Sequence, residues 1–142
     1  MAKQLNIFLE NKPGRLKAVT ELLYQNKINI RALSLQDRQD FGVLKIVVDK
    51  PEEAHIALTQ KGFACALKDI LAILMDDKPG GLHKITSLFV DNKINIQDAY
   101  AFVIESKKQA VLCVEVKDPK AIKVIIKKEG YKILEDEQLY EL

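Results

Sequence analysis

The chain has little of what many metal and redox sites need. It contains only two cysteines and two histidines. No Cys-x-x-Cys spacing and no Cys/His cluster occurs, and His55 and His83 are far apart in the sequence, so neither a metal nor a cofactor is expected. Cys65 and Cys113 both lie in apolar runs. This favours buried free thiols of a cytoplasmic protein over a disulfide.

Long apolar runs and a strong charge of one sign are also missing. The longest apolar run, Ile70 to Met75, is far shorter than the roughly 20 residues of a membrane-spanning helix. The first residues lack the charged start and apolar core of a signal peptide. A net charge of +2 is too small to indicate a nucleic-acid or acidic-membrane partner. We therefore expect a cytoplasmic protein that binds neither nucleic acid nor membrane.

What the chain does have is an internal repeat. The sequence NKPGRL at residues 11–16 returns as DKPGGL at residues 77–82, and NKINI follows both copies. Eleven of the nineteen positions from 12 to 30 are identical at an offset of 66 residues. Farther along, the offset becomes 68, as in Pro51 and Pro119, so the second copy has gained two residues after its equivalent of Ile30. We interpret this as two domains, residues 1–68 and 69–142, built as copies of one unit.

Hydrophobic patterning predicts the same elements in both copies. Pro51 can begin the second helix of the first copy and Gly62 can end it. The predicted strands of the first copy are 5–9, 28–32, 43–48 and 63–67, and its helices are 14–25 and 51–61. The predicted strands of the second copy are 70–75, 94–104, 109–116 and about 131–134, and its helices are 80–90 and 119–128.

This order of elements indicates an α+β fold. Strand, helix, strand, strand, helix, strand predicts the ferredoxin-like βαββαβ unit, with a four-stranded antiparallel sheet and both helices on one face. Only Lys68 and Asp69 separate the last strand of the first copy from the first strand of the second. We therefore expect two units in tandem with their sheets side by side.

The strands of the second copy are apolar on both of their faces. A sheet with helices on one face and water on the other should alternate apolar and polar residues, whereas residues 70–75, 99–104 and 110–114 do not. Large exposed apolar patches are uncommon on monomers. The pattern therefore predicts a homodimer in which the sheet faces without helices meet.

Each repeated turn leads into a predicted helix whose first backbone N–H groups are available to bind an anion. Gly14 and Gly80 stand where a helix is predicted to begin, and the first backbone N–H groups of a helix have no internal partner. Together with the helix dipole, these groups form a site for a carboxylate or a phosphate. Pro13 and Pro79 fix the chain just before each site. The alternative is that each Pro-Gly pair only makes a turn.

Asparagine or aspartate side chains accompany both turns. Asn11 and Asp77 precede them, and Asn29 and Asn95 begin the next strand, which we expect to lie beside the helix N-terminus. Their oxygens can accept hydrogen bonds from an ammonium group. Donors for a carboxylate at one end and acceptors for an ammonium at the other describe the binding site of a free α-amino acid.

The NKPGRL turn followed by Asn-Ile, on this order of elements, resembles the ACT domain, a module that senses amino acids in metabolic enzymes and regulators. The resemblance covers essentially the whole chain as a tandem pair, with no catalytic domain attached. It implies a non-catalytic sensor that binds an amino acid at the interface between two neighbouring units. It also implies regulation of a partner, such as a biosynthetic enzyme, or of the protein's own assembly.

The resemblance implies that two equivalent sets of residues, one in each copy, bind the ligand. Asp77 departs from the asparagine pattern, because a carboxylate attracts an ammonium group but repels the carboxylate of a ligand. The two sites are therefore expected to differ in affinity or ligand. The predicted sites are Asn11, Pro13, Gly14, Arg15, Leu16, Asn29 and Ile30 in the first copy, and Asp77, Pro79, Gly80, Gly81, Leu82, Asn95 and Ile96 in the second.

Two other functions share this topology. RNA-recognition domains stack bases on aromatic residues of the central strands, but Phe8 is the only aromatic residue in the first strand and residues 43–48 contain none. A small enzyme of the acylphosphatase kind would need arginines and a nucleophile paired with a base. The chain offers only three arginines and no such pair, so no catalytic residue is assigned. The lysine-rich helix over residues 119–128 is interpreted as a solvated face.

Overall fold

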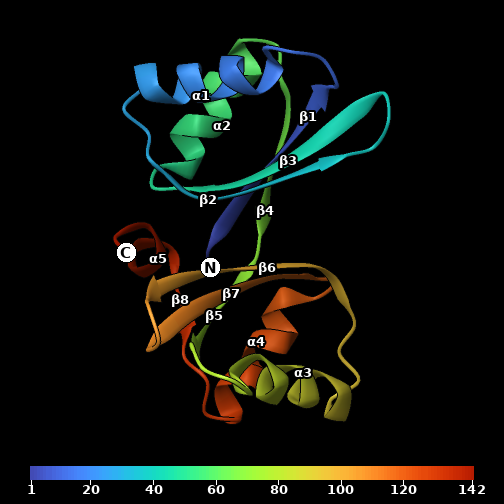
Figure 1. The fold of residues 1–142 in the computed structure, drawn as a ribbon, viewed down its shortest axis with the longest axis vertical. Coiled ribbons are helices and arrows are strands. Elements are labelled where there is room, and N and C mark those ends of the chain that lie inside the picture. The colour runs from blue at the N-terminus through green and yellow to red at the C-terminus, as the bar shows by residue number, and fades with distance from the viewer. The chain divides into compact units, whose positions relative to one another are not determined.

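The computed structural model describes all 142 residues, which form two compact units (Figure 1). The N-terminal unit comprises Lys3–Lys68 together with Tyr140–Leu142. The C-terminal unit comprises Asp69–Leu139 together with Met1–Ala2. Each unit therefore includes a few residues from the far end of the chain.

The N-terminal unit is one four-stranded sheet with two helices. The strand order is β2-β3-β1-β4, and β3 runs antiparallel to both β1 and β2. Both helices cover the same face of this sheet (Figure 1). The elements are β1 (Lys3–Glu10), α1 (Arg15–Gln25), β2 (Ile30–Asp37), β3 (Phe41–Val48), α2 (Pro51–Gln60) and β4 (Ala64–Asp69).

The C-terminal unit repeats this plan with the strand order β6-β7-β5-β8. The predicted ferredoxin-like βαββαβ order is therefore confirmed in both units. The short helix α5 was not predicted, because five residues are too few to show a helical period. The elements are β5 (Leu71–Asp76), α3 (Gly81–Asp91), β6 (Ile96–Glu105), β7 (Gln109–Val116), α4 (Pro119–Lys128), β8 (Ile133–Leu134) and α5 (Asp136–Tyr140).

Each unit has its own apolar core between the helices and the sheet. Alternate strand residues such as Leu5 and Ile7 are fully buried, and Leu23 of α1 packs against them. In the C-terminal unit, Leu71 and Ile85 do the same. Each such side chain contributes about 1.5–3 kcal/mol on burial. The cores hold the strands and the two repeated turns in place.

The repeated NKINI sequence ends a helix in both units. In the first copy, Lys27 is left-handed, with φ 56°, and the Ile28 N–H donates to the carbonyl of Leu23 over 2.9 Å. The Asn26 side chain donates to a second carbonyl near the helix end, that of Leu22, over 2.8 Å. Lys93 repeats the left-handed conformation, with φ 53°. This is the Schellman arrangement that satisfies the last carbonyls of a helix.

The sheet face opposite the helices is buried in the C-terminal unit. Ala72, Val111 and Cys113 alternate with core residues along β5 and β7, yet each is at most 1% exposed within the single chain. The predicted homodimer is not tested by this burial and stays a prediction.

Both cysteines are free. Burial raises the pKa of the Cys65 thiol to about 11 and that of the Cys113 thiol to about 12. Both thiols are therefore neutral near pH 7 and are poor nucleophiles. None of the five helices combines the length and the apolar content that a membrane span requires.

Candidate functional site

The helices α1 and α3 begin in the same unusual way. Gly14 and Gly80 are the N-cap residues, with φ of 90° and 86°, a left-handed conformation that glycine adopts at little cost. No side chain caps either helix. The first helical hydrogen bond of α1 is made by Ala18, whose N–H donates to the Gly14 carbonyl over 2.9 Å. The amides of Leu16 and Lys17 therefore stand open to an anion.

Asn11 joins the first turn to the hairpin between β2 and β3. Its backbone N–H donates to the Asp40 carbonyl over 3.1 Å. Its side-chain amide donates to Asp37 Oδ1 over 3.1 Å and to the Gln39 carbonyl over 2.8 Å. The amide donors of Asn11 are thus used within the protein, whereas its side-chain oxygen is left to accept a further hydrogen bond.

Asp77 also joins the second turn to its hairpin, but its side chain is a hydrogen-bond acceptor, whereas that of Asn11 is a donor. Its backbone N–H donates to the Lys108 carbonyl over 3.1 Å, as Asn11 does in the first unit. Its side chain, however, accepts a hydrogen bond of 2.7 Å from the Lys107 N–H. One carboxylate oxygen of Asp77 therefore has a structural role, and the other is left to accept a further hydrogen bond.

The hairpins explain why the two residues differ. Asp37 is paired with Gly42 in the first sheet, and the equivalent pair in the second sheet is Val103 with Ala110. The two extra residues of the second copy therefore lie in its hairpin, where a valine replaces the aspartate that accepts from Asn11. A carboxylate at position 77 suits the backbone donor that the longer hairpin presents instead.

Asn29 is not where it was expected. Ile30 pairs with Val48 at the end of β3, whereas Glu10 pairs with Phe41 at its beginning. Asn29 thus lies at the opposite end of the sheet from the first turn, and its N–H donates to Asp49 Oδ1 over 2.9 Å. The expectation was wrong because α1 runs back along β1, so the next strand begins beside the C-terminus of the helix.

Asn95 of the second unit also lies at the opposite end of its sheet from the turn. Ile96 pairs with Val116 at the end of β7, and Asp76 pairs with Gln109 at its beginning. Asn95 is therefore also remote from the second turn. Neither unit by itself brings its two predicted polar residues together.

A small cavity adjoins the first turn. Its volume is about 100 Å³, below the range of about 300–1,000 Å³ that is usual for small-molecule pockets. Three predicted residues line it, namely Asn11, Arg15 and Leu16. The remaining lining residues were missed because the hairpin and the end of β1 bring them there. They are Leu9, Glu10, Lys12, Leu35, Asp37 and Gly42.

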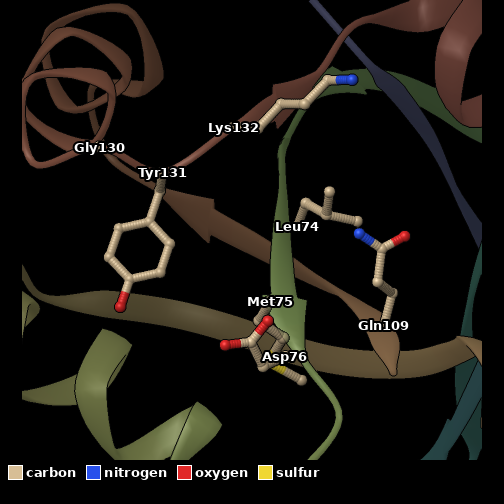
Figure 2. A pocket seen from close by; sticks show the side chains of 7 residues that line it. All are labelled: Leu74, Met75, Asp76, Gln109, Gly130, Tyr131 and Lys132. Carbon is tan, nitrogen blue, oxygen red and sulfur yellow. The ribbon is translucent and has the colours of Figure 1, made fainter. Parts of the chain in front are cut away.

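A larger cavity lies in the C-terminal unit, between the end of β5 and the connection from α4 to β8 (Figure 2). Its volume is about 290 Å³. Figure 2 shows the phenol of Tyr131 and the carboxylate of Asp76 along its wall. None of the predicted residues lines it. The full lining is Leu74, Met75, Asp76, Gln109, Gly130, Tyr131 and Lys132.

The residue after each N-cap glycine differs most between the turns. The guanidinium of Arg15 lies 4.9 Å above the centre of the Phe63 ring. The equivalent residue, Gly81, is buried, and a Cβ atom there would stand 2.2 Å from the Asp76 carbonyl oxygen. Gly81 thus allows the second turn to close tightly on the end of β5. The prolines before both turns, Pro13 and Pro79, are exposed.

A lysine accompanies each turn. Lys12 forms an ion pair with Glu10 over 2.8 Å, and Lys78 forms one with Asp76 over 3.6 Å. The hydrogen bond from Lys12 lowers the pKa of the Glu10 carboxyl below its usual value. Both pairs are exposed and add little stability. They place a positive charge beside each helix N-terminus.

Two exposed aromatic rings lie on the helix-free face of the first sheet. Phe8 of β1 is 52% exposed and Phe41 of β3 is 45% exposed, with 6.2 Å between their ring centroids. Only Phe8 was apparent from the sequence, because the pairing of Glu10 with Phe41 that brings the second ring close is set by strand register. Glu10 shares this face, and its carboxylate would repel the phosphates of an RNA strand.

Comparison with protein families gives a match over residues 1–142 to the model described as an ACT domain pair. Protein BT0572 from Bacteroides thetaiotaomicron has a similar crystal structure, with 33% identity, coverage of 99% of this chain and 96% of that one, and a TM-score of 0.92. Comparison with curated proteins gives no match.

Regulatory subunits of aspartate kinase are also similar. The ligand-free subunit from Thermus thermophilus is 15% identical, with coverage of 91% of this chain and 93% of that one and a TM-score of 0.66. The subunit from Thermus flavus is 15% identical, with coverage of 89% and 90% and a TM-score of 0.61. At this identity the likeness shows the fold alone.

Proposed function

The chain belongs to the family of ACT domain pairs, and on this basis we propose that it is a non-catalytic regulatory protein that binds a free amino acid. One observation carries the proposal above all. Gly14 and Gly80 begin equivalent helices with uncapped N-termini, each behind a proline and each tied to a hairpin. Two rigid sites for a carboxylate are thereby held ready without the ligand having to order them.

The ligand is proposed to lie between two units of this kind. Its carboxylate accepts from the open amides at the start of α1, those of Leu16 and Lys17. Its ammonium group donates to the side-chain oxygen of Asn11 and to Asn29 of a second unit. In the second set, Gly80, Asp77 and Asn95 take these roles, and the aspartate weakens that site through its charge.

A ligand shared by two units changes how those units associate. We therefore expect loading to alter the protein's own assembly or its contact with a partner, for which a biosynthetic enzyme of amino-acid metabolism is the proposed class. A homodimer and a cytoplasmic location complete the proposal. Light scattering tests the dimer, and a monomer at micromolar concentration would contradict it.

Titration with the common free amino acids tests ligand binding directly. A ligand present at about a hundredfold excess over its Kd should stabilise the protein by about 2.7 kcal/mol, which thermal unfolding detects. Isothermal titration then gives the affinity and the number of sites. Failure of every amino acid to bind in both assays would remove the proposal.

Glycine variants with matched controls locate the site. Gly14→Leu and Gly80→Leu place a bulky side chain where the ligand approaches. Gly62→Leu and Gly130→Leu are the controls, because these glycines also have positive φ, 84° and 89°, and a Cβ atom added at either would likewise have no neighbour within 4 Å. All four should cost about 1–3 kcal/mol of stability, since each forces a side chain into a left-handed conformation.

Only Gly14→Leu and Gly80→Leu should lose the rise in unfolding temperature that the ligand causes. The comparison within each pair separates loss of binding from loss of stability. If the shift survives in both turn variants, the ligand binds elsewhere.

A further inference from the structure

The second helices of the two units present equivalent exposed residues. Ile56 of α2 and Val124 of α4 are 68 positions apart, the offset of this part of the repeat. They are 55% and 67% exposed. Their helices direct other residues, such as Leu58 and Ile126, into the cores. Both units therefore expose a large apolar side chain at the centre of the same helix.

The residues around these two positions differ in charge. Positions three and four residues away lie on the same side of a helix. Around Ile56 they include two glutamates and no lysine, and around Val124 they include three lysines and no acid. The acidic helix face is Glu52, Glu53, Ile56, Thr59 and Gln60, and the basic helix face is Lys120, Ala121, Val124, Lys127 and Lys128, all of them exposed.

The two faces complement each other in one orientation. If the helices lie antiparallel with Ile56 on Val124, the glutamates that precede Ile56 come opposite the two lysines that follow Val124. A parallel arrangement would bring only Lys120 opposite the glutamates. Two basic faces would repel each other, and two acidic faces would gain no ion pair. Antiparallel helices also oppose their dipoles favourably.

We propose that the acidic helix face of one copy of this chain docks antiparallel on the basic helix face of a second copy. Each copy carries both faces, so the contact joins unlike surfaces of two copies. Lys127 is able to take part, because its own partner, Glu135, is 3.6 Å away and Lys127 is 52% exposed. A contact of one helix pair is small, so the association is weak and reversible.

Analytical ultracentrifugation from micromolar to millimolar concentration, at low salt, tests this contact. The wild-type chain should self-associate reversibly, and added salt should weaken the association. Val124→Asp should weaken it by at least about tenfold, because it removes the apolar centre of the interface. Val90→Asp is the matched control, since Val90 is a valine on α3 with 75% exposure, and this variant should associate as the wild type does.

Charge reversal gives the sharper test. One double variant, Glu52→Lys with Glu53→Lys, makes both faces basic. The other, Lys127→Glu with Lys128→Glu, makes both faces acidic. Each alone should associate at least about tenfold more weakly than the wild type, because like charges then meet. An equimolar mixture of the two should recover association, since each face of one variant then meets an opposite charge on the other.

Circular dichroism and thermal unfolding of every variant confirm that it is folded, as expected for changes at exposed positions. A wild-type chain that shows no association beyond the proposed homodimer up to millimolar concentration would overturn the helix contact. So would a further association that Val124→Asp leaves intact, because it would place that contact on another surface. Failure of the mixture to recover association would also overturn it. Amino-acid binding at the turns is measured separately and does not enter these outcomes.

Discussion

The two turns share a sequence motif, but the side chains that join them to their hairpins form hydrogen bonds of opposite direction. In the first, the Asn11 amide donates to Asp37 and to a hairpin carbonyl. In the second, the Asp77 carboxylate accepts from the backbone of Lys107. The exchange of asparagine for aspartate follows from the two residues added to the second hairpin. A charge at a proposed binding position can therefore have a structural cause close by.

The turns also differ in how tightly they close. In the first, the Arg15 N–H lies 3.4 Å from the Lys12 carbonyl oxygen, and its side chain extends over Phe63. In the second, the equivalent distance from the Gly81 N–H to the Lys78 carbonyl oxygen is 3.0 Å. The first turn adjoins a small cavity and carries a cation. The proposed amino acid should therefore bind more tightly at the first turn than at the second.

Gly81→Arg gives the second turn the residue of the first and should have the largest effect on stability. Its Cβ atom would overlap the Asp76 carbonyl oxygen, 2.2 Å away, and backbone yields less easily than a side chain. We expect a loss of about 3 kcal/mol, at the upper end of overpacking effects, measured by urea unfolding. The reverse change, Arg15→Gly, is the control and should cost about 1 kcal/mol. Equal costs would show that the two turns have the same geometry.

Exchanging the residues at 11 and 77 should produce unequal effects. Asn11→Asp sets a carboxylate beside Asp37 Oδ1 and a carbonyl, with no donor between them, and should cost about 1 kcal/mol. Asp77→Asn keeps an oxygen that can accept from the Lys107 N–H, and should cost about 0.5 kcal/mol or less. Thermal unfolding near neutral pH measures both. A greater loss in the second variant would contradict the hairpin explanation.

An acid-sensitive ion pair distinguishes the C-terminal unit, and its effect should be smallest. The hydrogen bond from Lys123 lowers the pKa of Glu135 from 4.5 to about 2, whereas the equivalent position in the N-terminal unit is Leu67. Because the folded-state pKa is the lower one, the pair stabilises the protein above pH 4.5 and loses this effect as the pH falls toward 2. Glu135 is partly exposed, so the contribution is about 0.5 kcal/mol.

Glu135→Gln should therefore lower the unfolding temperature slightly at neutral pH and by progressively less in acid. Thermal unfolding of both proteins across this pH range gives the comparison. A difference that is constant with pH would mean that the Glu135 charge has no part in stability.

The fold could be predicted because its determinants are local. Short apolar strand runs, amphipathic helices and a repeat of the whole unit are all visible in the sequence. The site was harder, since strand register places Asp37 and Leu35 beside Asn11, and register depends on hairpin length. The position of Asn29 was predicted wrongly because α1 runs back along β1, so β2 begins at the other end of the sheet. Asn26 and Lys27, beside it, serve to end the helix.

Lys27 and Lys93 hold left-handed backbones in which an L-amino acid is strained by about 1–2 kcal/mol. Glycine would relieve that strain while losing about 0.5–1 kcal/mol of chain entropy. Each replacement should thus raise the melting temperature modestly, at a place remote from both Pro-Gly turns. Both copies have a lysine at this position, so Lys27→Gly and Lys93→Gly are two independent substitutions that should raise the stability of the folded protein.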